Sequence, residues 1–447
     1  MLFRSAIIRP GPIVGKMMHP YMRRRQKKEK VTYPHPSLEP VLKRTLGVPL
    51  FQEQLLRIAM TVANFSGAEA EELRRAVGMR RSWERMKNLE AKLRAGMAVN
   101  GIDVKTQDTI VENISSFALY GFPESHAASF ALIAYTSAYL KVRYLAAFTC
   151  AILNNQPMGF YMPAVLVKDA QRHGLRIKPI DVQVSDWACT IEHERDGSLS
   201  MRMGLGYAKG LRKQAADALV ESRMRCGFFR SAEDLALRVQ LLNRKELTLL
   251  ARVGALNSLD GIEHRRDALW QVERAGKLEG PLLRQDSEWL REGSETLPLQ
   301  RMNIEERMVA DYSGTGLTVG RHPMHYRRNE LRQQGVLSAE ELRRCKDGEF
   351  VRAAGCVIAR QRPGTAKGFI FLSMEDETGI ANVIVTPDLY ERERMTVVRC
   401  KFLFVEGVLQ NQDGVIHVKA KRLAALNSAI STIPPQQQGA IKSADAR

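Results

Sequence analysis

The chain has 447 residues, of which 45% are hydrophobic and 26% charged, and its formal net charge is +18. This is the composition of an ordinary folded protein with enough apolar residues for several cores, so it excludes a chain that is disordered throughout. A charge-free apolar stretch near the middle, 127–140, is too short to cross a bilayer. The six cysteines form no CxxC pair, which argues against a zinc ribbon and a disulfide framework. With no secretory signal pattern at its start, we expect a cytoplasmic protein of about three domains and no membrane partner.

The positive charge is concentrated near the start of the chain. Residues 1–100 hold 20 Lys or Arg but only 8 acidic residues, all of them Glu. A local excess of this size is typical of proteins that bind a polyanion, so we expect nucleic acid or nucleotide phosphates as partners. The alternative is a solvated basic surface without a partner.

Residues 1–190 predict one mainly helical domain. Six prolines between positions 10 and 40 exclude long helices in the first 46 residues. Ser66 and Glu69 form a plausible capping box before one helix. The spacing of apolar residues predicts helices within 49–115, a long one over 125–153, and another over 161–174.

Four arginines carry the densest positive charge of this helical region. Arg74 and Arg75 end one predicted helix, and Arg80 and Arg81 follow just after Gly78. Guanidinium groups bind phosphate in a bidentate manner and stay charged, so the four can converge on one anion. The alternative is a solvated helix end, where cations also favour the helix dipole.

Residues 191–260 predict a tandem helix-hairpin-helix domain, an arrangement that binds DNA. Short predicted helices over 211–223, 231–238 and 243–252 are joined by turns that contain glycine. Such glycines let backbone N–H groups approach a phosphate, and the following helix adds partial positive charge. Lys209, Gly210 and Arg212 are therefore candidate DNA contacts, unless the loop is purely structural.

The remaining sequence predicts a connector, a small barrel and a tail. Residues 261–347 are polar, with helical patches, and are interpreted as the connector. Residues 348–425 predict three strands, a short helix and two strands, the order of a five-stranded OB-type barrel, so the fold class is α+β and multidomain. Phe369 and Phe371 are candidates for stacking on bases, unless they belong to the core. The tail, 426–447, is rich in Ser, Pro and Gln and is predicted to be disordered.

No catalytic or metal-ligating residue is predicted. Polymerases that use two metal ions commonly supply an Asp-x-Asp pair, which this chain lacks. The densest acidic cluster, 375–377, falls in a predicted hairpin turn, where we expect it to be solvated.

Several ordered motifs carry a resemblance to a known family. They lie at 8–13, 33–36, 51–54, 73–78, 120–128, 154–161, 167–174 and 311–324. The first five resemble the fingers region of bacterial C-family DNA polymerases, the relatives of the polymerase III alpha subunit. The next two resemble the error-prone, translesion branch of that family, and the last resembles its link between the hairpin and OB domains. The resemblance covers about 6–425.

The resemblance implies Mg²⁺-dependent, template-directed DNA synthesis in lesion bypass and repair. The fingers would bind the nucleoside triphosphate, the hairpin domain the primer-template duplex, and the OB domain single-stranded template or a partner. By motif match, the resemblance implies nucleotide-binding roles for Arg74, Arg75, Arg80, Arg81, Gln52, Gln54 and His126. The four arginines could equally contact the primer-template.

The chain also departs from the family pattern. Family members carry a PHP domain and a palm with the catalytic aspartates before the fingers, and Glu124 stands where a Lys is usual. We therefore expect the C-terminal portion of such a polymerase, active only when a palm-containing fragment is supplied. The sliding clamp and other mutagenesis proteins are further partners that the resemblance implies. The alternative is a non-catalytic DNA-binding remnant.

Overall fold

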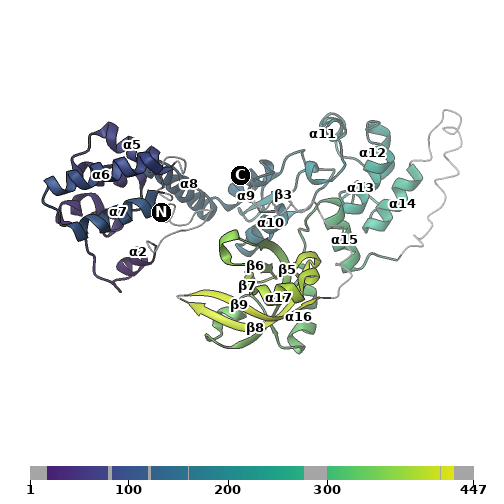
Figure 1. Ribbon diagram of the computed structural model, residues 1–447. Helices are drawn as coiled ribbons and strands as arrows, with labels where there is room; N and C mark the ends of the chain where they lie inside the picture. The colour runs from purple at the N-terminus through teal and green to yellow at the C-terminus, as the bar shows by residue number, and fades with distance from the viewer. Residues whose placement is uncertain are drawn as a thin grey trace, which may run out of the picture. The chain divides into compact units, whose positions relative to one another are not determined.

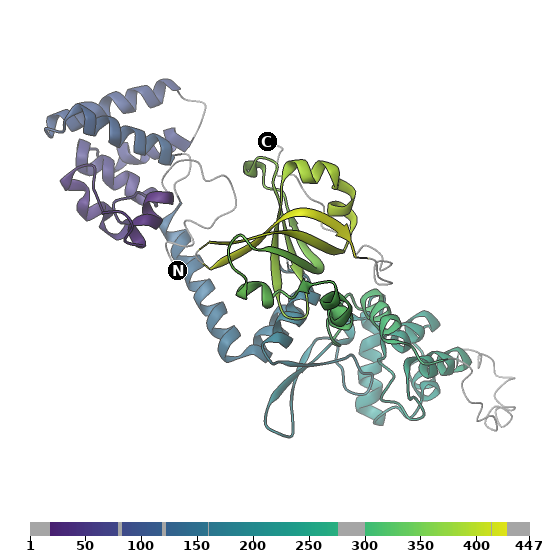
Figure 2. The ribbon, with the colours of Figure 1, turned by 90° about the horizontal axis from the view of Figure 1, so that it is seen from below.

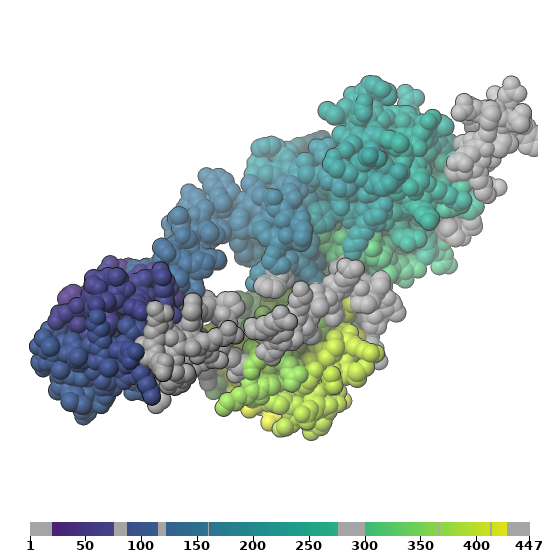
Figure 3. All heavy atoms as spheres, turned by 45° about the horizontal axis from the view of Figure 1, so that its top comes forward, coloured from purple at the N-terminus to yellow at the C-terminus, as the bar shows by residue number. Residues whose placement is uncertain are grey.

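The computed structural model describes residues 18–78, 83–118, 122–159, 161–275, 300–412 and 414–426, and the others are grey in Figures 1, 2 and 3. The chain divides into two compact units, 1–142 and 143–447. This division differs from the predicted boundary at residue 190. In the described part of the chain, no helix is both long and apolar enough to cross a membrane.

The first unit is helical throughout its described residues. Its helices are α2 (Met18–Arg25), α3 (Glu39–Leu42), α4 (Gln52–Ala63), α5 (Gly67–Gly78), α6 (Trp83–Val99), α7 (Val104–Ala118) and α8 (Glu124–Arg143). Buried Ala59, Val62 and Leu93 belong to the core that α4 to α7 share. The Ser66 N–H donates to Glu69 Oε2 at 2.9 Å and the Glu69 N–H donates to Ser66 Oγ at 3.3 Å, which confirms the predicted capping box.

The single long helix predicted over 125–153 is two helices. Helix α8 ends at Arg143, and α9 (Leu145–Asn154) begins two residues later. Tyr144 separates them with a φ of −134° and a ψ of 50°, which are not helical angles. Apolar periodicity continues across such a one-residue break, so the sequence pattern does not reveal it.

The second unit begins with a core that extends from Ala146 to Leu317. It is built from α9, α10 (Pro163–Arg172), α11 (Lys213–Cys226), α12 (Ala232–Arg238), α13 (Arg244–Val253) and α14 (Arg265–Ala275). A small sheet of β1 (Arg176–Lys178), β2 (Thr190–His193) and β3 (Leu199–Arg202) in the order β1-β3-β2 joins them. Ala268 and Val272 of α14 are buried in this core, so it continues past the predicted end of the hairpin domain at residue 260. Helix α15 (Ile304–Gly314) instead places Met308 in a separate core with Met324 and Phe402.

A closed five-stranded barrel follows (green to yellow in Figures 1, 2 and 3). Its strands are β5 (Phe350–Gln361), β6 (Ile370–Glu375), β7 (Ile380–Val385), β8 (Phe402–Gln412) and β9 (Val415–Ala425). They pair in the order β5-β6-β7-β9-β8, and β8 pairs back with β5 to close the barrel. Helices α17 (Pro387–Arg392) and α18 (Arg394–Arg399) stand between β7 and β8, which confirms the predicted OB order. Helix α16 (Pro323–Gln333) and β4 (Val336–Leu337) precede the barrel, and β4 pairs with β5.

Buried ion pairs join the barrel to the helices before it. Arg172 of α10 contacts Glu375 at 2.8 Å, and Arg328 of α16 contacts Asp376 at 3.0 Å. Glu375 and Asp376 are only 3% and 2% exposed. The prediction that 375–377 is a solvated turn is therefore wrong, because the turn folds against α10 and α16 and its carboxylates find arginines there.

Two further buried basic residues, Lys168 and His322, lie beside these ion pairs. The Lys168 ammonium donates to the backbone oxygen of Gly320, and burial lowers its pKa to about 8. His322 Nε2 lies 3.8 Å from Glu375 Oε2, and burial, followed by the charge of Lys168, lowers the pKa of His322 to about 3. Burial also raises the pKa of Glu375. We call these residues, with Arg172, Arg328 and Asp376, the buried charge cluster.

Candidate nucleic-acid interface

In the first unit, the beginnings of α4 and α8 are held together. The Gln52 N–H donates to the Phe122 oxygen at 3.1 Å, and the Glu124 N–H donates to Glu53 Oε2 at 2.9 Å. This junction places Gln52 beside the first turn of α8, which carries His126.

His126 presents its ring at the surface. Its ring centroid lies 5.1 Å from that of Phe122 and 4.5 Å from that of Phe130. Two flanking aromatic rings restrict the imidazole while leaving it exposed. His126 is therefore an exposed, laterally packed imidazole at the α4–α8 junction.

Gln54, in contrast, is buried and fully used within the fold. Its side-chain oxygen accepts the N–H groups of Leu50 at 2.8 Å and Phe51 at 3.1 Å. Its side-chain nitrogen donates to Val41 O at 3.1 Å and Thr45 Oγ1 at 2.9 Å. A glutamine amide has two donors and two acceptor lone pairs, so these four bonds occupy it. Gln54 holds the start of α4 in place.

Arg74 and Arg75 share one carboxylate. Arg74 Nη2 lies 2.6 Å from Glu71 Oε1, and Arg75 Nε lies 3.2 Å from the same oxygen. These bonds, that of Arg74 first, lower the pKa of Glu71 to about 2. Two guanidinium groups against one carboxylate leave a net positive charge, and the Arg75 side chain is 70% exposed. Arg80 and Arg81 lie outside the described residues.

Glu53 of α4 lies at the α4–α8 junction, and its charge also acts on Arg74. The pKa of Arg74 is raised, first by its hydrogen bond to Glu71 and also by the charge of Glu53. Glu53 is the residue that accepts the Glu124 N–H. Helix α4, which carries Gln52 and Glu53, packs against α5, which carries Arg74.

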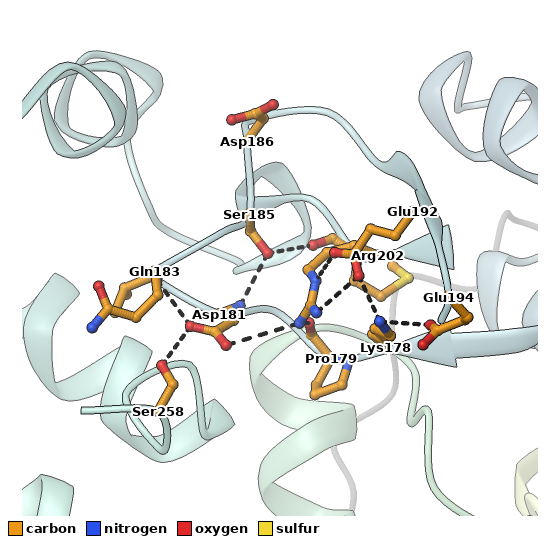
Figure 4. Close-up of polar contacts among 12 residues, drawn as sticks. Lys178, Pro179, Asp181, Gln183, Ser185, Asp186, Glu192, Glu194, Arg202 and Ser258 are labelled. Carbon is orange, nitrogen blue, oxygen red and sulfur yellow. Dashed lines mark hydrogen bonds and ion pairs between the residues drawn. The ribbon is translucent and has the colours of Figure 1, made fainter. Parts of the chain in front are cut away.

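A polar network on the three-stranded sheet supports the hairpin turn that precedes α11 (Figure 4). Arg202 of β3 pairs with Glu192 of β2, and Lys178 of β1 contacts Glu192 at 2.7 Å and Glu194 at 2.6 Å. Lys178 and Arg202 are thus paired with half-buried carboxylates of the protein itself. Their contribution is to fix β3, from which the chain enters the turn.

The glycines of the turn serve two different purposes. A Cβ at Gly204 would lie 2.4 Å from the Trp187 oxygen, and one at Gly206 would lie 3.1 Å from the Trp187 ring. Close packing against the Trp187 backbone therefore requires glycine at 204, whereas at 206 a Cβ would only crowd the Trp187 ring. Gly210 is exposed and has a φ of +103°, a conformation that favours glycine.

Lys209 and Arg212 also differ in their environments. Lys209 is exposed, although its backbone N–H donates to Gly314 O at 2.7 Å. Arg212 precedes α11, and its Nη2 lies 2.9 Å from Oε2 of Glu246, a carboxylate of α13 that is 3% exposed. It also donates to Leu241 O at 2.5 Å. The sequence predicts that both residues contact DNA. In the structure, the charge of Arg212 is paired with Glu246, whereas Lys209 is exposed.

The outer face of the barrel aligns aromatic and basic side chains from three strands. Register places Phe371 of β6 opposite Ile384 of β7, and Ile384 beside Lys419 of β9. The residues next to each in sequence are buried: Leu372, Val383 and Val418. Since side chains alternate along a strand, Phe371, Ile384 and Lys419 point away from the barrel interior. Lys421, two residues further along β9, is exposed.

Sequence reasoning missed Lys419 and Lys421 as candidates. The signal was the alternation of Ile416, Val418 and Ala420 with His417, Lys419 and Lys421, which marks one face of β9 as basic. Only the pairing of β9 with β7 puts that face next to Phe371. Phe369 lies before β6, half-buried, with its N–H donating to Ala366 O at 3.0 Å.

Nothing that could serve as a metal site, with at least three His, Cys, Asp or Glu side chains together, occurs in the described ranges. These residues therefore do not fit the Mg²⁺ that the resemblance implies.

Two family models match the chain. The model of the bacterial DNA polymerase III alpha subunit finger domain matches residues 1–101, and that of a helix-hairpin-helix motif matches residues 174–268. Over these residues the chain is similar to the finger domain of bacterial DNA polymerase III alpha subunits and to a helix-hairpin-helix motif.

Comparison with curated proteins is more specific. The error-prone DNA polymerase of Alkalilimnicola ehrlichii is 45% identical over 426 residues, which is 95% of this chain and 40% of that protein. The error-prone DNA polymerase of Pseudomonas fluorescens is 44% identical over 98% of this chain and 42% of its own length. Rhizobium meliloti error-prone DNA polymerase 2 is 39% identical over 99% of this chain and 41% of its own length. The chain is therefore homologous to error-prone DNA polymerases over nearly its whole length, and it spans about two fifths of theirs. Among solved structures, an asparaginyl-tRNA synthetase from Pyrococcus horikoshii is 24% identical over 21% of this chain and 22% of its own chain. Its TM-score is 0.18, too low to indicate a shared fold.

Proposed function

We propose that this chain is the nucleotide- and DNA-binding part of an error-prone DNA-directed DNA polymerase that acts in damage-tolerant synthesis and repair. The observation that carries the proposal is the homology with error-prone DNA polymerases over 95% of the chain. The outward row of Phe371, Ile384 and Lys419 supports it, because an aromatic platform with adjacent cations suits single-stranded nucleic acid.

In the first unit, the proposed ligand is the nucleoside triphosphate. Arg74 and Arg75, with Arg80 and Arg81, would hold its phosphates, since several guanidinium groups bind such oxygens in a bidentate manner. Gln52 and His126 would contact the same nucleotide from the α4–α8 junction. Gln54 would act through its cap, by positioning Gln52.

In the second unit, the proposed ligand is the primer-template DNA. The exposed Lys209 ammonium and the close approach allowed at Gly210 would contact a duplex phosphate. Arg212 would keep α11 and α13 in register through Glu246. Phe371, Lys419 and Lys421 would hold the single-stranded template, with Phe369 at the edge of that face.

The remaining parts of the family activity also stand as proposals. No step on this chain runs through Mg²⁺, and we propose that its ligands belong to a palm-containing fragment outside this chain. We also propose that the sliding clamp and other mutagenesis proteins are partners of the chain and that it acts in the cytoplasm.

The test is primer extension. This chain would be combined with the part of the A. ehrlichii polymerase that it does not match, as a separate polypeptide and as a chimera that carries this chain in the matching position. We expect Mg²⁺-dependent extension of a primed template, and loss of extension on Arg74→Ala with Arg75→Ala. Absence of extension in both formats, with DNA binding intact, would instead identify a non-catalytic DNA-binding remnant.

A further inference from the structure

Helix α8 exposes large apolar side chains around most of its circumference. Leu132, Ile133, Tyr135 and Val142 are 67%, 59%, 62% and 79% exposed. The structure describes every residue of α8, and among them Ala127 alone is buried. In Figure 2, α8 extends beyond the other helices of its unit.

This pattern differs from that of an ordinary surface helix. Such a helix is apolar on one stripe, which faces a core, and polar elsewhere. In α8, the seven-residue spacing stacks Ile133 with Leu140 on one side and Tyr135 with Val142 on another. Between Glu124 and Lys141 the helix has no charged residue. A helix that is apolar on several sides is normally buried in the working molecule, so α8 is expected to be covered.

The relatives indicate what covers it. Error-prone DNA polymerases match this chain over about 40% of their length, so about three fifths of the polymerase is not represented here. Helix α8 starts at the junction that presents Gln52 and His126. A polypeptide that completes the nucleotide site at this junction has to lie beside α8.

We propose that the apolar surface of α8 is the docking site for the polymerase polypeptide that this chain does not contain. This inference rests on the proposed function, because it takes the α4–α8 junction as the nucleotide site. Leu132, Ile133 and Tyr135 become buried at that interface. A second copy of the chain and the second unit of the same chain are the competing occupants.

Cysteine labelling distinguishes these occupants. In a background with exposed Cys226 replaced by Ser, Leu132→Cys is introduced and its maleimide labelling rate is measured. The rate is compared between the full chain alone and the chain co-purified with the unmatched part of the A. ehrlichii polymerase. We expect at least tenfold slower labelling in the complex. Val99→Cys, at the end of α6 and 81% exposed, is the matched control and should react equally fast in both.

Three results would overturn the proposal. Equal rates for Leu132→Cys in both samples would show that the partner leaves α8 uncovered. Slow labelling in the chain alone would mean that α8 is covered by a second copy, if the rate depends on concentration, or by the second unit, if it does not. Failure of the soluble fragment to co-purify would exclude docking, and if that fragment is insoluble the polymerase chimera gives the same readout. DNA binding by the chain alone is measured separately, so loss of the docking proposal and loss of the proposed function are distinguishable.

Discussion

The β6–β7 hairpin has two regions in which charge has different roles. At its turn, Asp376 is buried against Arg328 and accepts the N–H of Ala339 at 2.8 Å. Along its strands, Phe371 points outward near Lys419 of β9. A carboxylate that is buried with its partner attaches one part of the fold to another, whereas an outward row of aromatic and basic groups is available to a polyanion. Charge density in the sequence does not distinguish these roles. What distinguishes them is whether the fold brings an oppositely charged partner to the side chain.

Removing one member of a buried pair should have the largest effect. Arg328→Leu leaves Asp376 buried without its counter-ion, so we expect the free energy of unfolding to fall by about 3–5 kcal/mol. Urea denaturation followed by circular dichroism measures this. Arg344→Ala, which removes an exposed pair with Glu340, should change stability by less than about 1 kcal/mol. Similar small losses for both variants would contradict the claim that the buried pair at the turn stabilises the fold more than an exposed pair does.

The turn before α11 allows a similar comparison, between a cation that is paired with a buried carboxylate and one that is exposed. Arg212→Ala leaves the buried Glu246 without its main partner and should lower the urea midpoint of unfolding. Lys209→Ala should leave the unfolding midpoint unchanged but weaken binding of duplex DNA. Urea denaturation and fluorescence anisotropy on both variants check this. The reverse pattern would exchange the roles assigned to the two residues.

The outward face is tested by its aromatic side chain. Phe371→Ala should reduce affinity for single-stranded DNA by about 1–3 kcal/mol, because stacking on a base is lost. Phe350, 59% exposed at the start of β5 and paired with β8, is the matched control, and Phe350→Ala should bind normally. Fluorescence anisotropy with a labelled oligonucleotide gives both affinities. Equal losses would contradict a specific role for the β6–β7–β9 face.

The buried charge cluster should also make stability depend on pH. The pKa of His322 falls from 6.5 to about 3 on folding, chiefly through burial. Its contribution is therefore present above pH 6.5 and is lost as pH falls toward 3, because the unfolded chain takes up the proton first. Between pH 6.5 and 5.5 the expected loss from this group is about 1 kcal/mol.

His322→Asn provides the control, since Asn can accept the Met324 N–H that His322 Nδ1 accepts at 3.2 Å. Thermal unfolding at the two pH values should show a smaller decrease for the variant than for the parent chain. An identical decrease in both would assign the pH dependence to other groups.

Local patterns predicted much of the fold from the sequence. The strands of the barrel and helices α11, α12 and α13 follow from alternation, helical periodicity and glycine-containing turns. The break at Tyr144 was missed because apolar periodicity runs through it. The candidate site was harder to predict from the sequence, because its side chains depend on partners that lie far away along the chain. Arg212 meets Glu246 across 34 positions, and Lys419 joins Phe371 only through the strand order of the barrel.

The central claim, that exposed cations of this chain bind a sugar-phosphate strand, is tested most directly by the salt dependence of DNA affinity. The logarithm of the binding constant for a single-stranded oligonucleotide should fall linearly with the logarithm of salt concentration, by about 0.7 per phosphate contact. Lys419→Ala with Lys421→Ala should lower the magnitude of that slope by about 1.4. An affinity that does not change with salt, or a slope that is the same in the double variant, would contradict the account.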